Sequence, residues 1–211
     1  KVCKTLTIDI QDEANRKYLT RSELITLLQE KRLYPIGKSV KEIDLQQIEH
    51  AIETHPMIRK AECYTRLSGE VVIQLSQRVP ILRVDVGNES YFIDSDRKRM
   101  PIRASVTDKI LPVVGNVGQR MASEEIADLV EWIQHDRYWH DKINKVYVCN
   151  PHLVKLVQSI DGTTILLGEC KDYSRKMRRL QTLYEKGFEK IGWQTYREYD
   201  LRYEGQVIGR K

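Results

Sequence analysis

The sequence predicts an α+β protein of two modules: a small mixed sheet with two helices on one face, then a mainly antiparallel sheet with flanking helices. Segments of alternating hydrophobicity are interleaved with segments of helical periodicity. The first 80 residues follow the order strand, helix, helix, strand, strand. Pro80 then interrupts an alternating strand, because proline has no N–H for a central ladder. We therefore place a first domain at residues 1–79 and a second at residues 80–211.

The composition is that of a folded protein with a well-solvated surface. Hydrophobic residues make up 41% of the 211 residues and charged residues 31%. The net charge of +5 is small beside 35 basic and 30 acidic residues, so charge favours nucleic-acid binding only weakly. No apolar run approaches the roughly 20 residues that span a bilayer. Because Lys1 opens the chain without a methionine, we expect it to be an excised portion of a longer protein.

The first module begins with an alternating strand. Leu6, Ile8 and Ile10 share one face of it. A helix follows from Thr20, whose hydroxyl and the carboxylate of Glu23 can form a capping box. A second helix is predicted from Asp44, with Gln47 three residues on, and Pro56 ends it, while a strand follows over 58–66.

The return strand, 69–80, connects the two modules. Val71, Ile73 and Leu75 alternate along it, and Pro80 biases the preceding residue toward an extended conformation. The chain is therefore expected to leave one sheet still extended and to enter another. The residues of this junction are Gln77, Arg78 and Pro80.

The second module opens with strands at 81–86 and 91–94. Asp94 and Asp96 follow, and they could suggest a calcium loop, but the later glycine and distal glutamate of such a loop are missing. We interpret them as turn-forming residues. The element Leu111–Gly115 comes next, and Ser123 is predicted to cap the helix that follows.

An aromatic cluster at the end of that helix includes Trp132, Tyr138 and Trp139, beside His135, Asp136 and His140. Histidine and aspartate can act as general acid and base, but the sequence marks no nucleophile or substrate cradle beside them. We interpret the cluster as packing with a charged rim. No nucleotide loop, elbow-type nucleophile or metal-ligand pattern occurs, so we predict a binding protein without a cofactor, not an enzyme.

Cys3, Cys63, Cys149 and Cys170 are widely spaced and form no C-x-x-C pair, which argues against a zinc ribbon or a dithiol site. Three strands are expected at 143–148, 153–160 and 163–168. In that meander Cys149 and Cys170 fall on opposite sides of the middle strand, too far apart for regular bridging. We expect both to be free thiols. A thiol titration of unreduced, denatured protein should therefore return every cysteine, and a lower count would contradict the prediction.

A basic helix is predicted from Asp172. Its residues Lys171, Arg175, Lys176, Arg178, Arg179 and Lys186 could neutralise phosphates, so DNA or RNA is one candidate partner. Interleaved acids and the lack of a stacking surface favour a solvated helix, or one that faces an acidic partner. Failure to retain DNA, whatever the salt concentration, would dismiss the nucleic-acid alternative.

Several motifs in order resemble a known family. Ile48–Ala61 reads Ile-x-x-Ala-Ile-x-x-x-Pro-x-Ile-x-x-Ala, which looks like a POTRA domain. Gln77-Arg78-Val79-Pro80, the Leu-Pro-x-Val-Gly element at 111–115, Leu-Leu-Gly at 166–168 and the closing stretch Tyr199–Gly205 resemble the FtsQ/DivIB cell-division proteins. The turn after Asp94 departs from the family, which often places glycine there.

The resemblance implies a non-enzymatic division-complex scaffold with one membrane-spanning helix, absent from this chain, and an extracytoplasmic POTRA plus β-domain. This chain would lie in the periplasm, anchored to the inner membrane. The implied partners are the coiled-coil proteins FtsB and FtsL and other divisome membrane proteins, with no nucleic acid. A segment of the FtsB-like partner would add a strand to the last strand of the β-domain.

The expected partner-binding residues follow from the closing motif. Arg202 and Tyr203 match the family's contact pair, and Gly205, Gln206, Val207 and Ile208 would supply the edge backbone. A tryptophan that some members carry further along is replaced here by Gly209-Arg210-Lys211. The alternative is a POTRA-containing, chaperone-like module of an outer-membrane export or assembly system, although repeated POTRA modules and a barrel region are absent from this sequence.

Overall fold

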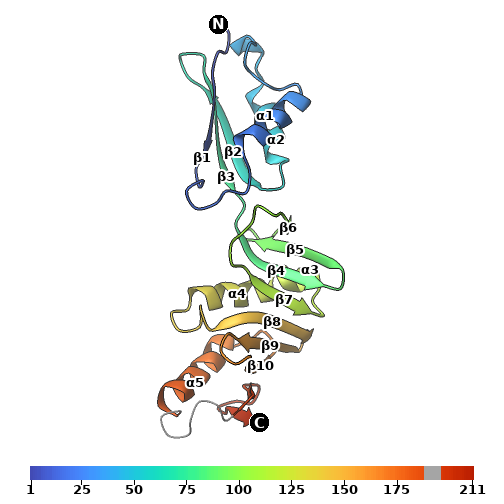
Figure 1. Ribbon diagram of the computed structural model, residues 1–211, viewed down its shortest axis with the longest axis vertical. Helices are drawn as coiled ribbons and strands as arrows, with labels where there is room; N and C mark the ends of the chain where they lie inside the picture. Colours follow the sequence, from blue (N-terminus) through green and yellow to red (C-terminus); the bar gives the residue numbers. More distant parts are fainter. Residues whose placement is uncertain (188–195) are drawn as a thin grey trace. The chain divides into compact units, whose positions relative to one another are not determined.

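The computed structural model describes residues 1–187 and 196–211. It divides into two compact units. Unit 1 comprises Lys1–Val79 and Pro101–Asp108, and unit 2 comprises Pro80–Met100 and Lys109–Lys211. Figure 1 shows the helices and strands of each unit along the sequence.

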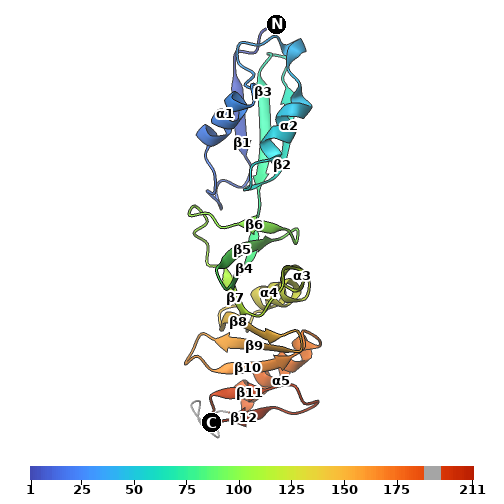
Figure 2. The same cartoon turned by 90° about the vertical axis from the view of Figure 1, so that its right-hand side faces the viewer.

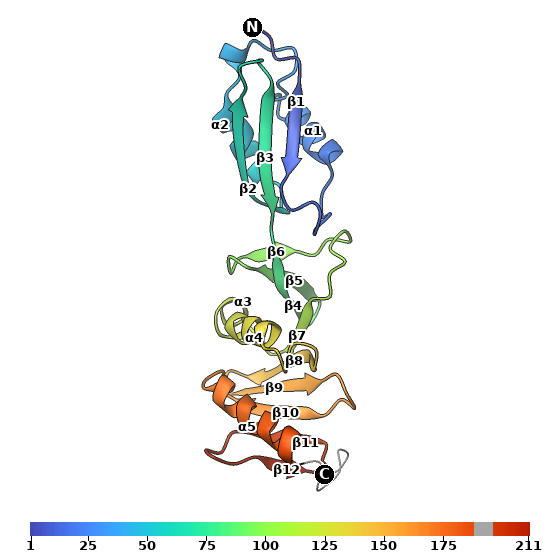
Figure 3. The same cartoon turned by 90° about the vertical axis from the view of Figure 1, so that its left-hand side faces the viewer.

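Unit 1 is a three-stranded sheet covered on one face by two helices (Figure 3). Strand β3 (Val71–Gln77) is central, parallel to β1 (Leu6–Ile10) and antiparallel to β2 (Ile58–Thr65). The helices are α1 (Arg21–Glu30) and α2 (Leu45–Glu53), with the short 3-10 turn η1 (Val40–Glu42) between them. The predicted order strand, helix, helix, strand, strand is confirmed.

Both predicted helix starts in unit 1 are confirmed. Thr20 and Glu23 form a reciprocal capping box, with the Thr20 N–H 2.6 Å from the Glu23 carboxylate. The Asp44 carboxylate accepts the Gln47 N–H at 3.0 Å. These contacts satisfy amide groups that the first turn of a helix otherwise leaves unpaired.

The junction residue Gln77 is fully buried. Its side-chain oxygen accepts the Tyr18 N–H at 2.9 Å, and its amide nitrogen donates to the Arg16 carbonyl at 2.7 Å. Arg78 donates its own N–H to the Met57 carbonyl at 2.8 Å. These two residues therefore stabilise the end of unit 1, and Pro80 begins the first strand of the other sheet.

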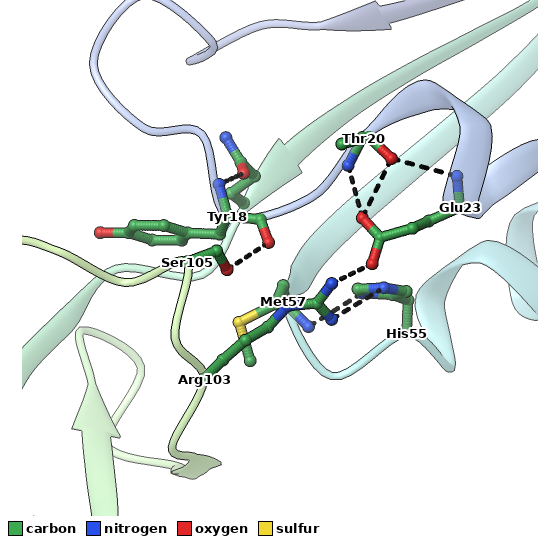
Figure 4. Close-up of polar contacts among 8 residues, drawn as sticks. Tyr18, Thr20, Glu23, His55, Met57, Arg103 and Ser105 are labelled. Carbon is green, nitrogen blue, oxygen red and sulfur yellow. Dashed lines mark hydrogen bonds and ion pairs between the residues drawn. The ribbon is translucent and has the colours of Figure 1, made fainter.

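The segment Pro101–Asp108 packs within unit 1, whereas the sequence pattern placed it in the second domain. Figure 4 shows Ser105 and Arg103 beside the start of α1. The Ser105 hydroxyl donates to the Tyr18 carbonyl at 2.7 Å, and the Arg103 guanidinium pairs with Glu23. His55 lies next to Arg103, and burial together with that positive charge lowers the pKa of His55.

Unit 2 contains one mixed sheet, nine-stranded among the described residues. The strand order is β12-β11-β10-β9-β8-β7-β4-β5-β6. The β8, β9 and β10 meander is antiparallel, as predicted, whereas β7 runs parallel to both β4 and β8, and β11 runs parallel to β10. The strands are β4 (Pro80–Val86), β5 (Glu89–Asp94), β6 (Arg99–Pro101), β7 (Leu111–Gly115), β8 (Ile143–Asn150), β9 (Leu153–Gln158), β10 (Thr164–Gly168), β11 (Glu198–Asp200) and β12 (Ile208–Arg210).

Three helices among the described residues accompany this sheet, and one predicted cap is wrong. They are α3 (Gln119–Ser123), α4 (Glu125–His135) and α5 (Tyr173–Lys186). Ser123 does not cap α4, because it is the last residue of α3 and its hydroxyl donates to the Arg120 carbonyl. The apolar stripes of α4 and α5 share one core with the sheet, which includes the fully buried Trp139. The sequence predicts that the basic helix extends to residue 190 and that the closing segment of the chain begins at Thr195; residues 188–190 and Thr195 lie outside the described residues.

The turn after β5 is formed without glycine. Arg97 takes the left-handed backbone conformation at φ 65°, where glycine is the usual residue. The buried Asp94 carboxylate accepts the N–H groups of Asp96 and Lys98 at 3.0 and 2.8 Å, and Arg97 pairs with Asp128 and Glu131. Asp94 therefore has a structural use in this turn.

No helix in the described parts of the chain is long and apolar enough to cross a bilayer. All four cysteines, Cys149 and Cys170 among them, are free thiols. Burial raises the pKa of Cys170 to about 12, which keeps it protonated and poorly nucleophilic. That all four thiols titrate in solution remains a prediction.

Candidate functional site

The C-terminal edge of the unit 2 sheet is formed by β12. Figure 2 shows β12 as the last strand of this sheet, beyond β11. It pairs antiparallel with β11 through Ile208 opposite Asp200 and Arg210 opposite Glu198. No described strand pairs with its other side. An unpaired edge offers N–H and C=O groups to which another chain can add a strand.

A buried carboxylate connects β11, the loop after it and β12. Asp200, in β11, is fully buried, and it accepts two hydrogen bonds from Arg202, at 2.9 Å from Nε and 2.7 Å from Nη2. Arg210, in β12, donates to the same carboxylate at 2.9 Å. The hydrogen bonds from Arg202 lower the pKa of Asp200, and the positive charge of Arg210 adds to this effect. The network therefore connects β11, the following loop and β12.

Arg202 and Tyr203 have different roles in this arrangement. The Arg202 guanidinium is bound to Asp200 of its own chain, which leaves it a limited capacity to hold an acidic partner side chain. Tyr203 is 50% exposed, and the Arg202 guanidinium lies 5.9 Å from its ring centroid. Both residues matched to the family's contact pair reach solvent, Tyr203 at 50% and the Arg202 side chain at 37% exposed, but the Arg202 guanidinium is already bound to a carboxylate of its own chain.

The predicted edge segment coincides only in part with the strand. Gly205 lies in a turn at φ 70°, and the Gln206 N–H donates to the Tyr203 carbonyl at 3.3 Å. Val207 packs partly against the core and lies before β12. Because β12 begins at Ile208, that residue is the only predicted edge residue within the strand. Sequence reasoning therefore missed Gly209 and Arg210.

Gly209 has a packing reason that no local pattern reveals. A Cβ atom there would lie 2.7 Å from the ring of Tyr196, so only glycine allows that ring to lie against β12. The tyrosine is thirteen positions away in sequence, so its contact with Gly209 has no local signature.

Helix α5 borders a groove beside this edge. The groove has a volume of about 600 Å³, and its basic lining residues are Lys171, Arg175, Lys176, Arg179 and Arg202. Arg179 donates to the carbonyls of Tyr203 and Leu201 at 3.1 and 3.3 Å, which fixes the loop before β12. Lys171 pairs with Glu169 at 2.9 Å, so the positive charge of the groove is partly neutralised.

The aromatic and histidine cluster has a structural use. The buried Asp136 carboxylate accepts the N–H groups of Tyr138 and Trp139 at 2.9 and 3.0 Å and pairs with Arg178 at 2.5 Å. The Asp136 carboxylate is therefore already bonded to the residues that follow α4 and to Arg178 of α5. Within residues 1–187 and 196–211, no group of three His, Cys, Asp or Glu side chains is placed to hold a metal ion.

Comparisons with known proteins agree with this architecture. Residues 79–210 match the family model described as FtsQ/DivIB, C-terminal related, and residues 1–76 match the model of a POTRA-like domain. The chain is 23% identical over 201 residues to a cell division protein FtsQ of Syntrophotalea carbinolica, an alignment that covers 89% of this chain and 68% of that protein. Because the first model covers more than half of its residues, the chain belongs to the FtsQ/DivIB C-terminal-related family and carries a POTRA-like domain before that region.

Proposed function

We propose that this chain is the extracytoplasmic part of a cell-division scaffold anchored in the inner membrane. Membership of the FtsQ/DivIB family supports a role in division, and the FtsQ relative supports the membrane-anchored location. The proposed boundary of the POTRA-like domain is residue 79. The chain acts by binding, because the buried carboxylates of Asp94, Asp136 and Asp200 already accept hydrogen bonds from backbone N–H groups or from arginine side chains.

The observation that carries the binding function is the open edge of β12 beside Tyr203. A coiled-coil partner of the FtsB or FtsL kind contributes an extended segment, which continues the sheet beyond β12. Tyr203 packs against that segment, because its exposed ring provides a large apolar contact at little entropic cost. Arg202 acts mainly by holding the edge in place through Asp200.

The POTRA-like unit provides further binding surface for other membrane proteins of the divisome. Its sheet has two outer strands, β1 and β2, and strand addition is a general way to bind such edges. The alternative function is that of a chaperone-like module of an outer-membrane export or assembly system. The match of residues 79–210 to the FtsQ/DivIB model favours the division scaffold.

Tyr203→Ala is expected to weaken binding of an FtsB-like partner about tenfold while leaving the free energy of unfolding nearly unchanged. The ring is half exposed, so its loss removes interface contact and little core packing. The measurement is a titration of the full chain with a purified FtsB-like segment, together with urea unfolding.

Tyr147→Ala is the matched control for this experiment. Tyr147 is 44% exposed and lies on β8, an inner strand of the same sheet. Its loss should leave partner binding unchanged. If Tyr203→Ala and Tyr147→Ala bind the segment as the unchanged chain does, the contact assigned to Tyr203 is wrong.

A further inference from the structure

One end of unit 1 presents a leucine that is almost completely exposed. Leu67 is 99% exposed and lies in the turn between β2 and β3. This turn is closed by hydrogen bonds from the Gly69 N–H to the Arg66 carbonyl at 2.8 Å and from the Arg66 N–H to the Glu70 carbonyl at 2.9 Å. The turn is thus well formed, and it holds the leucine side chain in solvent, where burying it would be favourable.

The first residues of the chain lie against this turn. The Lys1 ammonium donates to the Leu67 carbonyl. The Lys1 side chain lies so close to the turn that a Cβ atom at Gly69 would be 3.4 Å from it. Val2, 49% exposed, forms a bridge to Ser39 on its other side. Figure 3 shows the chain start at the same end of unit 1 as the β2–β3 turn. Two exposed apolar side chains are therefore carried by neighbouring segments.

The cations at this end exceed the acids. Lys1, Lys38, Lys41 and Arg66 belong to these segments, against Glu42 and Glu70. The ammonium groups of Lys1 and Lys38 donate to backbone carbonyls, so their positive charges are not cancelled by these contacts. Arg66 pairs with Glu70 at 3.0 Å. The surface around Leu67 is therefore apolar at its tip and positive around it.

We propose that this end of unit 1 docks on the anionic surface of a phospholipid bilayer, with Leu67 entering the headgroup region. The proposal rests on the proposed function, which anchors the chain in the inner membrane. Lipid surfaces of this kind attract lysines and accept exposed apolar side chains. A protein partner fits less well, because one leucine and one half-exposed valine provide far less apolar area than a stable protein interface of about 1,000 Å².

The test is co-sedimentation of the full chain with vesicles at millimolar lipid, comparing phosphatidylcholine alone with phosphatidylcholine containing phosphatidylglycerol. We expect binding to the anionic vesicles only, weakened several-fold by raised salt. Leu67→Ser should reduce this binding at least fivefold. Because Leu67 makes no core contact at 99% exposure, the variant should unfold at the same urea concentration as the unchanged chain.

Ile160→Ser is the matched control. Ile160 is 69% exposed and lies between β9 and β10 in unit 2, so its replacement removes a similar side chain from a different turn. It should leave vesicle binding unchanged. Equal binding by Leu67→Ser and the unchanged chain, or no binding of the unchanged chain to anionic vesicles, would overturn the proposal.

The same samples separate this proposal from the proposed function. A lipid-free titration with the FtsB-like segment should be unaffected by Leu67→Ser, and Tyr203→Ala should bind vesicles normally. If the unchanged chain does not bind the FtsB-like segment, that result counts against the division scaffold. The vesicle experiment still tests the membrane proposal independently.

Discussion

Asp200→Ala is expected to destabilise unit 2 by about 2–3 kcal/mol and to abolish measurable partner binding at β12. Removing one member of a buried ion pair typically costs about 3–5 kcal/mol, because a charge is left without its partner. The cost here falls below that range, since the side chains of Arg202 and Arg210 are 37% and 48% exposed and water can solvate them. The loss of binding follows because Asp200 connects β11 to β12.

Urea unfolding at neutral pH checks the stability, and titration with the FtsB-like segment checks the edge. Glu198→Ala is the control, because Glu198 also pairs with Arg210, at 3.1 Å, but is partly exposed. Its loss should cost less than about 1 kcal/mol, as is usual for exposed pairs. Equal stability of both variants and the unchanged chain would show that the buried carboxylate contributes nothing.

The pH dependence gives the same prediction a second readout. The pKa of Asp200 is lowered in the folded state, chiefly by Arg202, so its contribution to stability is complete above the unfolded-state pKa of about 3.9. That contribution is lost as the pH falls through the lower, folded-state pKa. The difference in stability between Asp200→Ala and the unchanged chain should therefore shrink in strongly acidic buffer and remain constant from pH 5 to 7.

Local signals accounted for much of the fold. The capping box at Thr20 and Glu23 and the cap at Asp44 involve residues three apart, so the sequence alone specifies them. The change of sheet at Pro80 was equally readable, because proline restricts its own position and the one before it. Such features depend on neighbours in the chain and not on the tertiary structure.

Features that depend on tertiary contacts were missed or misplaced. Ser123 had the correct residue type for a cap, but the short α3 ends there and leaves α4 to begin after it. The packing of Ser105 against Tyr18 joins positions 87 apart and leaves no periodic trace.

The motif indicated where to place the candidate site, which stays a prediction, but the contacts within that site had no local signal. The motif indicated Arg202 as a partner contact, whereas the structure shows its hydrogen bonds to Asp200. A charged residue in a motif can bind a partner or hold the motif in shape, and only the position of its counter-ion distinguishes these uses. The roles of Gly209 and Arg210 were not predicted, because the residues that they contact lie in other segments of the chain.

Gly115→Ala is expected to be the most destabilising of these substitutions, by more than about 3 kcal/mol. Gly115 has φ 99°, and an added Cβ atom would lie 2.3 Å from the backbone oxygen of Val148. Neither the strand nor its neighbour can yield easily, because Gly115 pairs with Val148 in the parallel β7–β8 ladder and the Asn116 N–H donates to that same oxygen at 2.7 Å. Backbone strain and a backbone clash therefore act together.

The β7–β8 ladder joins the part of the sheet formed by β4, β5 and β6 to the part that ends in β12, so its disruption should also lower partner binding. Gly87→Ala separates strain from clash, because Gly87 has φ 57° and open space around its Cβ position. That control should lose only about 1 kcal/mol in urea unfolding, the usual cost of a left-handed backbone for a residue with a Cβ atom. Similar losses for the two variants would mean that β7 shifts to accept the methyl group. A much larger loss for Gly115→Ala would explain why the Leu-Pro-x-Val-Gly element ends in glycine, since only glycine lets β7 leave its ladder at this distance from β8.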